Sequence, residues 1–409
     1  MADDKMNKEE KRNALLAQFK ETKAELAERK GDDIFPKCEN PELVVDVAIP
    51  EGIREIGKRA FSECKNLKSV TFPESLEVIG VDSFSDCTSL KEITLPKNVK
   101  KICSWAFSRC HSLEKVILNE GLEFIGEVAF AGTPIKSIRI PDSVTTLEHD
   151  AFESCEKLEE ALLSKKITNI GSRTFCHCIS LKSIEIPCSV TTIGEIAFSC
   201  CVALESIKIP DSVTKMGYGV LEHNHKLKSV TISKNLEEIP KDTFYDCPVL
   251  ENVEIPSNIK KIGEGAFEDC NSLKKIEIPG SVKTIEAAAF GECKKLKELV
   301  INEGLFVIGK VAFSSCDNLS KVILPQSLTE IQKEAFSLCK SLTEITYAGS
   351  KKQWGKVNKN SSWRDRSSLK VIHCWDGDVV LKEKVVKLNV PENLKSFYIC
   401  CLKTDIYRF

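Results

Sequence analysis

The sequence has no apolar run that approaches the roughly 20 residues of a membrane-spanning helix. It also lacks an excess of charge of either sign, because 58 Lys and Arg residues are balanced by 60 Asp and Glu residues. A clustered basic surface, which nucleic acid binding requires, is therefore not indicated, and neither is attraction to an anionic membrane. We expect no nucleic acid partner and no membrane insertion.

The first 37 residues lack the apolar core of a secretory signal, since they carry nine acidic and nine basic residues. The sequence as it stands thus predicts a cytoplasmic protein, although a trimmed start would hide a signal. Catalytic motifs are missing as well: there is no G-x-S-x-G, P-loop or H-E-x-x-H pattern. The six His residues and the carboxylates are scattered along the chain. We expect no enzymatic activity and no cofactor.

What the chain does have is an internal repeat marked by phenylalanine. The spacing is 23 residues, apart from one step of 22, and Leu221 fills the single vacancy. The marker residues are Phe61, Phe84, Phe107, Phe130, Phe152, Phe175, Phe198, Phe244, Phe267, Phe290, Phe313 and Phe336.

Each unit reads as one coil of a solenoid. Leu67, Val70 and Phe72 have the L-x-x-L-x-L spacing of leucine-rich repeats, and alternation over residues 69–72 predicts a short strand that Pro73 ends. Residues 60–64 suggest a short helical turn on the opposite side. A single unit cannot cover its own apolar face, whereas stacked units can. We predict a right-handed leucine-rich-repeat solenoid with a parallel β-sheet along one side and short helical turns or strands opposite.

Both ends of such a stack need caps. Residues 1–42 are predicted to form a charged, helical N-terminal cap, residues 43–347 about 13 repeat units, and residues 348–409 a C-terminal cap. The last segment holds Trp354, Trp363 and Trp375, bulky residues outside the repeat pattern.

Cysteine follows the same period. Of 19 cysteines, eleven lie three residues after a marker, as a buried ladder would require. Parallel side chains oppose the torsion of a disulfide, so we predict free thiols, also for the neighbouring Cys200 and Cys201. The ladder residues are Cys64, Cys87, Cys110, Cys155, Cys178, Cys201, Cys247, Cys270, Cys293, Cys316 and Cys339.

One stretch carries a family likeness. The phrase I-P-x-S-V-x-x-I-G-x-x-A-F-x-x-C-x-x-L is intact from Ile186 to Leu204 and resembles the BspA-like class of leucine-rich repeats. The resemblance covers about residues 43–347, and the segment from Tyr347 to Gly377 is similar to one that often follows these repeats in bacterial members. It implies a non-enzymatic, protein-binding scaffold, in particular a cell-surface or secreted adhesin. The alternative is an intracellular structural or scaffolding protein with no single dominant site.

The outward face of the predicted strands is the candidate binding surface. It combines mixed charge with scattered aliphatic residues and has no aromatic side chain, which favours a protein partner over sugars or single-stranded nucleic acid. A merely solvated sheet face is the alternative. The candidate residues are Ile117, Arg139, Leu162, Glu185, Lys208, Glu254, Glu277, Val300 and Ile323.

One column holds zinc-ligand types, two residues after the marker in four consecutive repeats: His177, Cys200, His223 and Asp246. Stacked side chains do not naturally converge into a tetrahedron, and the rest of the column is mostly polar. We therefore expect an ordinary exposed column and no metal. The repeat around Leu221 is irregular, with Tyr218, Asn224 and His225 in unusual places, and we interpret it as a drifted copy or an interaction spot.

Overall fold

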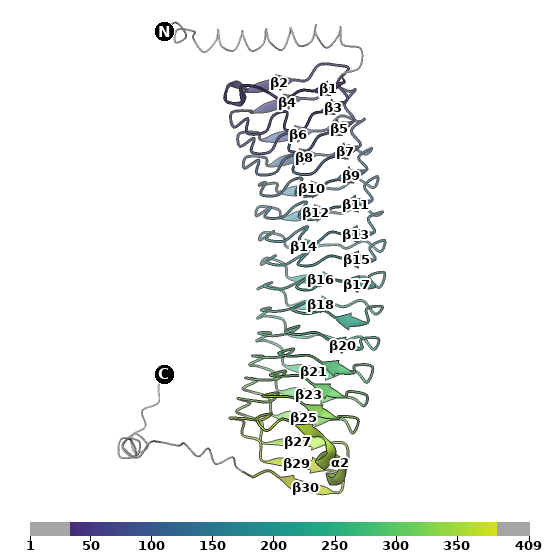
Figure 1. Cartoon of the computed structure of the whole chain (residues 1–409), viewed down its shortest axis with the longest axis vertical. Coiled ribbons are helices and arrows are strands. Elements are labelled where there is room, and N and C mark those ends of the chain that lie inside the picture. The colour runs from purple at the N-terminus through teal and green to yellow at the C-terminus, as the bar shows by residue number, and fades with distance from the viewer. Residues whose placement is uncertain (1–32, 383–409) are drawn as a thin grey trace, which may run out of the picture.

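The computed structural model describes residues 33–382 as a single stack of short coils (Figure 1). The charged helical part of the expected N-terminal cap lies outside the described residues. Within residues 33–382, helix is confined to a 3-10 turn, η1 (Pro41–Leu43), and one short helix, α2 (Lys351–Lys356). The predicted solenoid with parallel strands is confirmed, while the handedness of its winding stays a prediction.

One side of the stack, here called the main strand row, contributes a strand from nearly every coil. Within the row, neighbouring strands pair in parallel in five separate sheets, and the last of these holds six strands. The strands are β2 (Asp46–Ala48), β4 (Ser69–Thr71), β6 (Glu92–Thr94), β8 (Lys115–Ile117), β10 (Ser137–Arg139), β12 (Glu160–Leu162), β14 (Ser183–Ile184), β16 (Ser206–Lys208), β18 (Ser229–Thr231), β21 (Lys275–Ile278), β23 (Glu298–Ile301), β25 (Lys321–Leu324), β27 (Glu344–Tyr347), β29 (Val371–Cys374) and the antiparallel β30 (Gly377–Val380).

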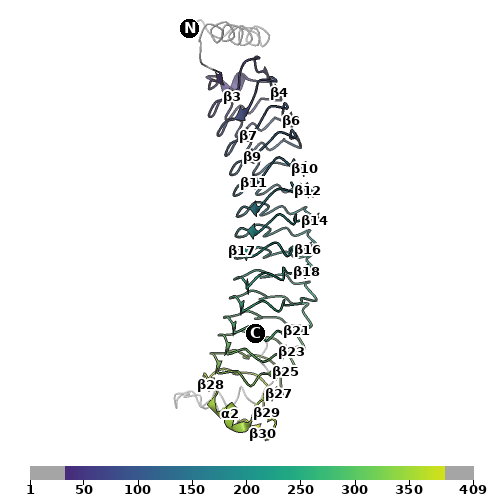
Figure 2. The ribbon, with the colours of Figure 1, turned by 90° about the vertical axis from the view of Figure 1, so that its right-hand side faces the viewer.

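The opposite edge holds a second row of two-residue strands, here called the short strand row (Figure 2). It forms parallel sheets of nine and six strands, so the expected strands opposite the main row are present. They are β1 (Ile34–Phe35), β3 (Glu55–Ile56), β5 (Val78–Ile79), β7 (Lys101–Ile102), β9 (Phe124–Ile125), β11 (Thr146–Leu147), β13 (Asn169–Ile170), β15 (Thr192–Ile193), β17 (Lys215–Met216), β19 (Glu238–Ile239), β20 (Lys261–Ile262), β22 (Thr284–Ile285), β24 (Val307–Ile308), β26 (Glu330–Ile331) and β28 (Asn358–Lys359).

The segment around each marker forms successive turns, and the helical turn expected there is not confirmed. Around Phe84, both Asp82 and Asp86 have positive φ, 57° and 59°. This backbone points alternate N–H groups along the stack: the amides of Phe84 and Asp86 donate to the carbonyls of Ala106 and Ser108 at 2.8 and 2.9 Å. Because the next coil accepts these hydrogen bonds, an internal helical hydrogen-bond pattern is not needed.

The marker rings form the centre of the core. Consecutive rings stack with centroids 5.0 to 5.6 Å apart, from Phe35 to Phe198 and again from Phe244 to Phe336, with Leu221 between the two stacks. Phe35, which the sequence analysis assigned to the N-terminal cap, is thus the first ring of the column. Such contacts add about 0.5–1.5 kcal/mol each to simple apolar burial.

The cysteine ladder is buried as predicted, and the cysteines in the described part of the chain are free thiols. Its members have a second role that the sequence analysis missed: ten of them donate S–H to the marker carbonyl of the preceding coil, at 3.1 to 3.3 Å. Where the ladder lacks cysteine, Thr133 and Asn224 stand instead, and both are hydrogen-bond donors to marker carbonyls. This position therefore requires a residue whose side chain can donate a hydrogen bond to a marker carbonyl.

The segment after Tyr347 covers the last repeat. Ser350 caps the N-terminus of helix α2 in a capping box with Gln353. The buried Trp354 of this helix packs against Tyr347 and Trp363, with ring centroids 5.1 and 6.0 Å apart. Trp375, in contrast, is 73% exposed. Strand β30 pairs antiparallel with β29 and ends the parallel ladder. The two domain boundaries themselves stay a prediction.

Candidate functional site

The outward side chains of the main strand row form the candidate binding face. Each strand alternates between core and solvent; in β12, Glu160 and Leu162 are exposed and Ala161 is buried. All nine residues expected from the sequence lie at outward positions of this row. Seven are exposed, and Val300 and Ile323 are half-buried.

The backbone register places these residues on neighbouring coils. Arg139 lies directly beside Leu162 in the β10–β12 ladder, and Val300 lies beside Ile323 in the β23–β25 ladder. The aliphatic residues therefore form two separate regions, one near β8 to β12 and one near β23 to β25. The charged residues Glu185, Lys208, Glu254 and Glu277 occupy the coils between them.

Charges on the adjacent outward row are paired near both ends of the face. Lys115 is 3.4 Å from Glu92 on the preceding coil. Towards the C-terminus, Glu298 lies between Lys275, at 3.8 Å, and Lys321. The opposite charges within these pairs compensate each other, so little unpaired charge is left there to interact with a binding partner.

The middle of the face is different, because the adjacent row there is mostly serine: Ser137, Ser183, Ser206 and Ser229. Leu162, on the strand of Glu160, is 51% exposed, and Ile117, on the strand of Lys115, is 44% exposed. Glu185 and Lys208 are exposed and form no ion pair with any residue in the described part of the chain. We name Ile117, Arg139, Leu162, Glu185 and Lys208 the central patch.

An alternating column of charge runs beside the main strand row, at the residue before each strand. From Glu114 to Lys274 its sign alternates in every coil, with ion pairs of 2.6 to 3.5 Å. Sequence reasoning missed this column, although the 23-residue alignment displays it. Because each charge lies beside an opposite one, this edge of the sheet has no net positive potential that would attract a polyanion. Its members are Glu114, Lys136, Glu159, Lys182, Glu205, Lys228, Glu251 and Lys274.

Two open depressions lie on the main strand row. One, of about 980 Å³, is lined by residues of β4, β6 and β8 and by the segments beside them. The other, of about 500 Å³, surrounds Asn252, Glu254 and Glu277. Both have mixed polar and aliphatic linings, so they can accept protruding side chains of a protein partner.

The ladder thiols are unsuited to nucleophilic chemistry. Burial raises the pKa of Cys155, Cys247 and Cys339 to about 12, since the thiolate would be desolvated. The pKa of Cys201 is raised as well, and its neighbour Cys200 is half-buried.

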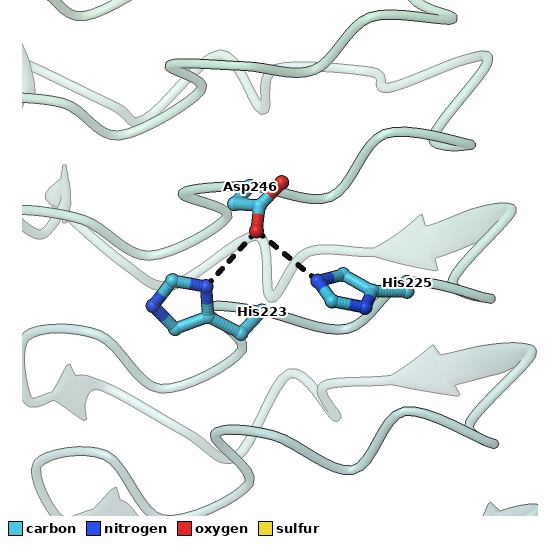
Figure 3. A group of neighbouring side chains, drawn as sticks. All are labelled: His223, His225 and Asp246. Atoms are coloured by element: carbon cyan, nitrogen blue, oxygen red, sulfur yellow. Dashed lines mark hydrogen bonds and ion pairs between the residues drawn. The ribbon is translucent and has the colours of Figure 1, made fainter.

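The four residues of the possible metal column do not meet as one group. The His177 ring contacts Cys176, with Nδ1 and Sγ 3.1 Å apart, and the Ser199 hydroxyl donates to the Cys200 sulfur at 3.5 Å. His223 and Asp246 do come together, with Nδ1 3.1 Å from Oδ2 (Figure 3).

A residue from outside that column joins the pair. His225 Nε2 also lies 3.1 Å from Asp246 Oδ2, so both imidazoles meet the same carboxylate oxygen (Figure 3). The sequence signal was the His-Asn-His triplet in the irregular repeat, but reading single columns separated His225 from its neighbours.

The comparisons with known proteins agree with this architecture. The family described as BspA type Leucine rich repeat region matches residues 31–159, 145–274 and 237–360. The chain belongs to the BspA-type leucine-rich repeat family. A comparison with curated proteins found no match.

Solved structures that include leucine-rich repeat proteins of bacteria are similar to the chain. A leucine-rich repeat protein from Bacteroides ovatus is 31% identical, with 75% of this chain and 84% of that chain covered and a TM-score of 0.63. A leucine rich cell surface protein from Faecalibacterium prausnitzii is 25% identical, covering 77% and 91%, with a TM-score of 0.36. The pneumococcal vaccine antigen PcpA is 20% identical, covering 87% and 84%, with a TM-score of 0.48. Within residues 33–382, this BspA-type chain has no helix long and apolar enough to cross a membrane.

Proposed function

We propose that this BspA-type chain is a non-enzymatic scaffold that binds another protein through the central patch. The observation that carries the proposal is the exposed Leu162, followed by Glu185 on the next coil and Lys208 on the coil after it, two charges without an ion-pair partner in the described part of the chain. Arg139, in the same patch, is paired with Glu120 at 3.3 Å, and the adjacent outward row is paired near both ends of the face. A large exposed aliphatic residue among available charges is a common composition for a protein interface.

The backbone beneath the patch favours binding. Leu162 is held in the β10–β12–β14 ladder, whose inward residues Ile138, Ala161 and Ile184 are buried. A partner therefore meets a preformed surface, and little conformational entropy is lost on association.

In its finer form the proposal is an adhesin that acts at the cell surface, as the family resemblance implies. The alternative is an intracellular scaffold whose coils bind without a single dominant site. Protease shaving of intact host cells separates the two: release of fragments from the surface supports the adhesin, and full protection with free thiols supports the scaffold.

The binding face itself is tested with a matched pair of variants. Leu162→Glu places a charge in the central patch, and Ile179→Glu places one in a turn outside the two strand rows, where Ile179 is 39% exposed. Proteins captured from extracts of the host and its surroundings are then compared for both variants and for the unmodified chain.

We expect Leu162→Glu to weaken capture of a specific partner by about 2 kcal/mol or more, roughly thirtyfold, as for a hot-spot residue. Ile179→Glu should leave it unchanged. Equal capture by all three proteins would refute the central patch as the binding site and favour the scaffold without a dominant site.

A further inference from the structure

The coil that contains Leu221 interrupts the solenoid in two places. In the core, Leu221 separates the rings of Phe198 and Phe244, so the ring column is broken. In the short strand row, the sheet ends at β17 and a new one starts at β19. At this joint the amides of the marker segment still donate to the next coil, as from Leu221 to Thr243 at 3.0 Å, but the ring contact and the short-row strand pair that link neighbouring coils elsewhere are missing.

Pro240 explains the break in the short strand row. In neighbouring coils a glycine occupies this position, and the amides of Gly217 and Gly263 donate to Ile193 and Ile239 at 2.9 and 2.8 Å. Proline has no N–H group and cannot donate the corresponding hydrogen bond.

The cysteine ladder changes at the same joint. Asn224 replaces cysteine, is fully buried, and donates through Nδ2 to the carbonyls of Phe198 and Leu221 at 3.0 and 2.9 Å. These two hydrogen bonds hold the backbone at Asn224, which lies between His223 and His225 in the sequence. The two imidazoles are thus positioned by a rigid residue between them.

The next coil supplies the third member. Asp246 Oδ2 lies 3.1 Å from His223 Nδ1 and 3.1 Å from His225 Nε2, and the donor atoms of the three side chains all lie within 4.8 Å of one another (Figure 3). The Tyr245 ring packs edge-on against the His223 ring, with centroids 5.2 Å apart, which restricts that imidazole. The three side chains are 34 to 52% exposed, so an ion in solution can reach them.

This donor set matches a transition metal. Zinc takes imidazole nitrogen and carboxylate oxygen at about 2.0–2.2 Å, usually in a tetrahedron, whose ligand atoms lie about 3.4 Å apart. The two separations of 3.1 Å need little adjustment to reach that value. Calcium and magnesium prefer oxygen ligands and suit two imidazoles poorly.

We propose that His223, His225 and Asp246 bind a divalent transition metal ion of the zinc type, with water completing the coordination. The ion would link two consecutive coils at the joint where both the ring column and the short strand row are interrupted. It would act as a structural clamp, replacing contacts that the other coils obtain from stacked rings and paired strands. A single-column reading of the sequence could not find this site, because its ligands come from two columns.

The experiment uses the full chain, kept reduced, stripped of metal with a chelator and dialysed. Zn²⁺ binding is measured by calorimetry and by metal analysis after dialysis, and Co²⁺ is added separately so that its visible absorption reports the coordination geometry. The test variants are His225→Ala and Asp246→Asn. The controls are His111→Ala, an exposed histidine on a distant coil, and Cys188→Ser, which removes an exposed thiol.

We expect a single Zn²⁺ ion per chain, at least a tenfold loss of affinity in both test variants, and no change in the controls. Zn²⁺ should also raise the unfolding midpoint of the unmodified chain and have no such effect on His225→Ala, since binding only the folded state stabilises it. His225 is half exposed, so His225→Ala is expected to fold, as circular dichroism will show.

Three results would overturn the proposal. They are failure to retain Zn²⁺ after dialysis, retention that His225→Ala leaves unchanged, and retention that only Cys188→Ser abolishes. The first would mean that the three side chains form a plain hydrogen-bonded cluster.

Discussion

Replacing Asn224 by cysteine is expected to stabilise the solenoid by about 1 kcal/mol. Asn224 is fully buried, and its Oδ1 atom has no hydrogen-bond partner among the described residues. A buried polar atom without a partner costs about 1–3 kcal/mol, and the substitution removes it. The new thiol would keep the hydrogen bond to Phe198, as the other ladder thiols do at 3.1 to 3.3 Å.

The substitution also has a cost. Cysteine cannot make the second hydrogen bond, from Asn224 Nδ2 to the Leu221 carbonyl, worth about 0.5–1.5 kcal/mol. That carbonyl still accepts from the Cys247 thiol at 3.2 Å, so it is not left unpaired. The difference between the gain and the cost gives the net stabilisation of about 1 kcal/mol.

The assay is urea unfolding of the metal-free chain, followed by hydrogen exchange that resolves the coils around residue 224. The matched control is the reverse change, Cys270→Asn, which should destabilise by about 1–3 kcal/mol because it buries an unpartnered oxygen. A lower midpoint for Asn224→Cys would refute the reasoning and show that both hydrogen bonds outweigh the orphaned oxygen. If Asn224→Cys stabilises the chain but weakens Zn²⁺ binding, the asparagine serves the metal site at the expense of stability.

Two further predictions follow from the pKa shifts. Burial raises the pKa of Cys155 and Cys247 to about 12. These two thiols should therefore remain unmodified by iodoacetamide in the folded chain at about pH 8, whereas the exposed Cys188 should react. Mass spectrometry that finds Cys155 and Cys247 modified to the same extent as Cys188 would contradict this prediction. The Asp378 and Glu344 carboxylates raise the pKa of His373 above its ordinary value of about 6.5. The stability that His373 contributes by linking β29 to β30 and β27 is therefore complete below that value and is lost as the pH rises through the raised value. Unfolding of His373→Gln should therefore differ from that of the unmodified chain at acidic pH and converge with it at alkaline pH, and a constant difference would count against the ion pairs.

The repeat made much of this structure predictable from sequence alone. A spacing of 23 residues assigns every residue to a column, and hydrophobicity within the column decides whether it faces the core. The ring column, the buried cysteines and the outward position of Leu162 and Arg139 were therefore accessible without coordinates. Binding by the central patch remains a proposal, because outward position alone does not select a partner.

Tertiary structure decided how neighbouring columns relate to one another. Positive φ on either side of each marker sends alternate amides to the next coil, so turns form where a helical turn was expected. The same geometry turns His223 and His225, which belong to different columns, towards one carboxylate on the next coil. The repeat spacing in the sequence determines which residues stack in the same column. The backbone angles within each coil determine where side chains of different columns meet. These angles depend on hydrogen bonds between coils, which exist only once the coils are stacked.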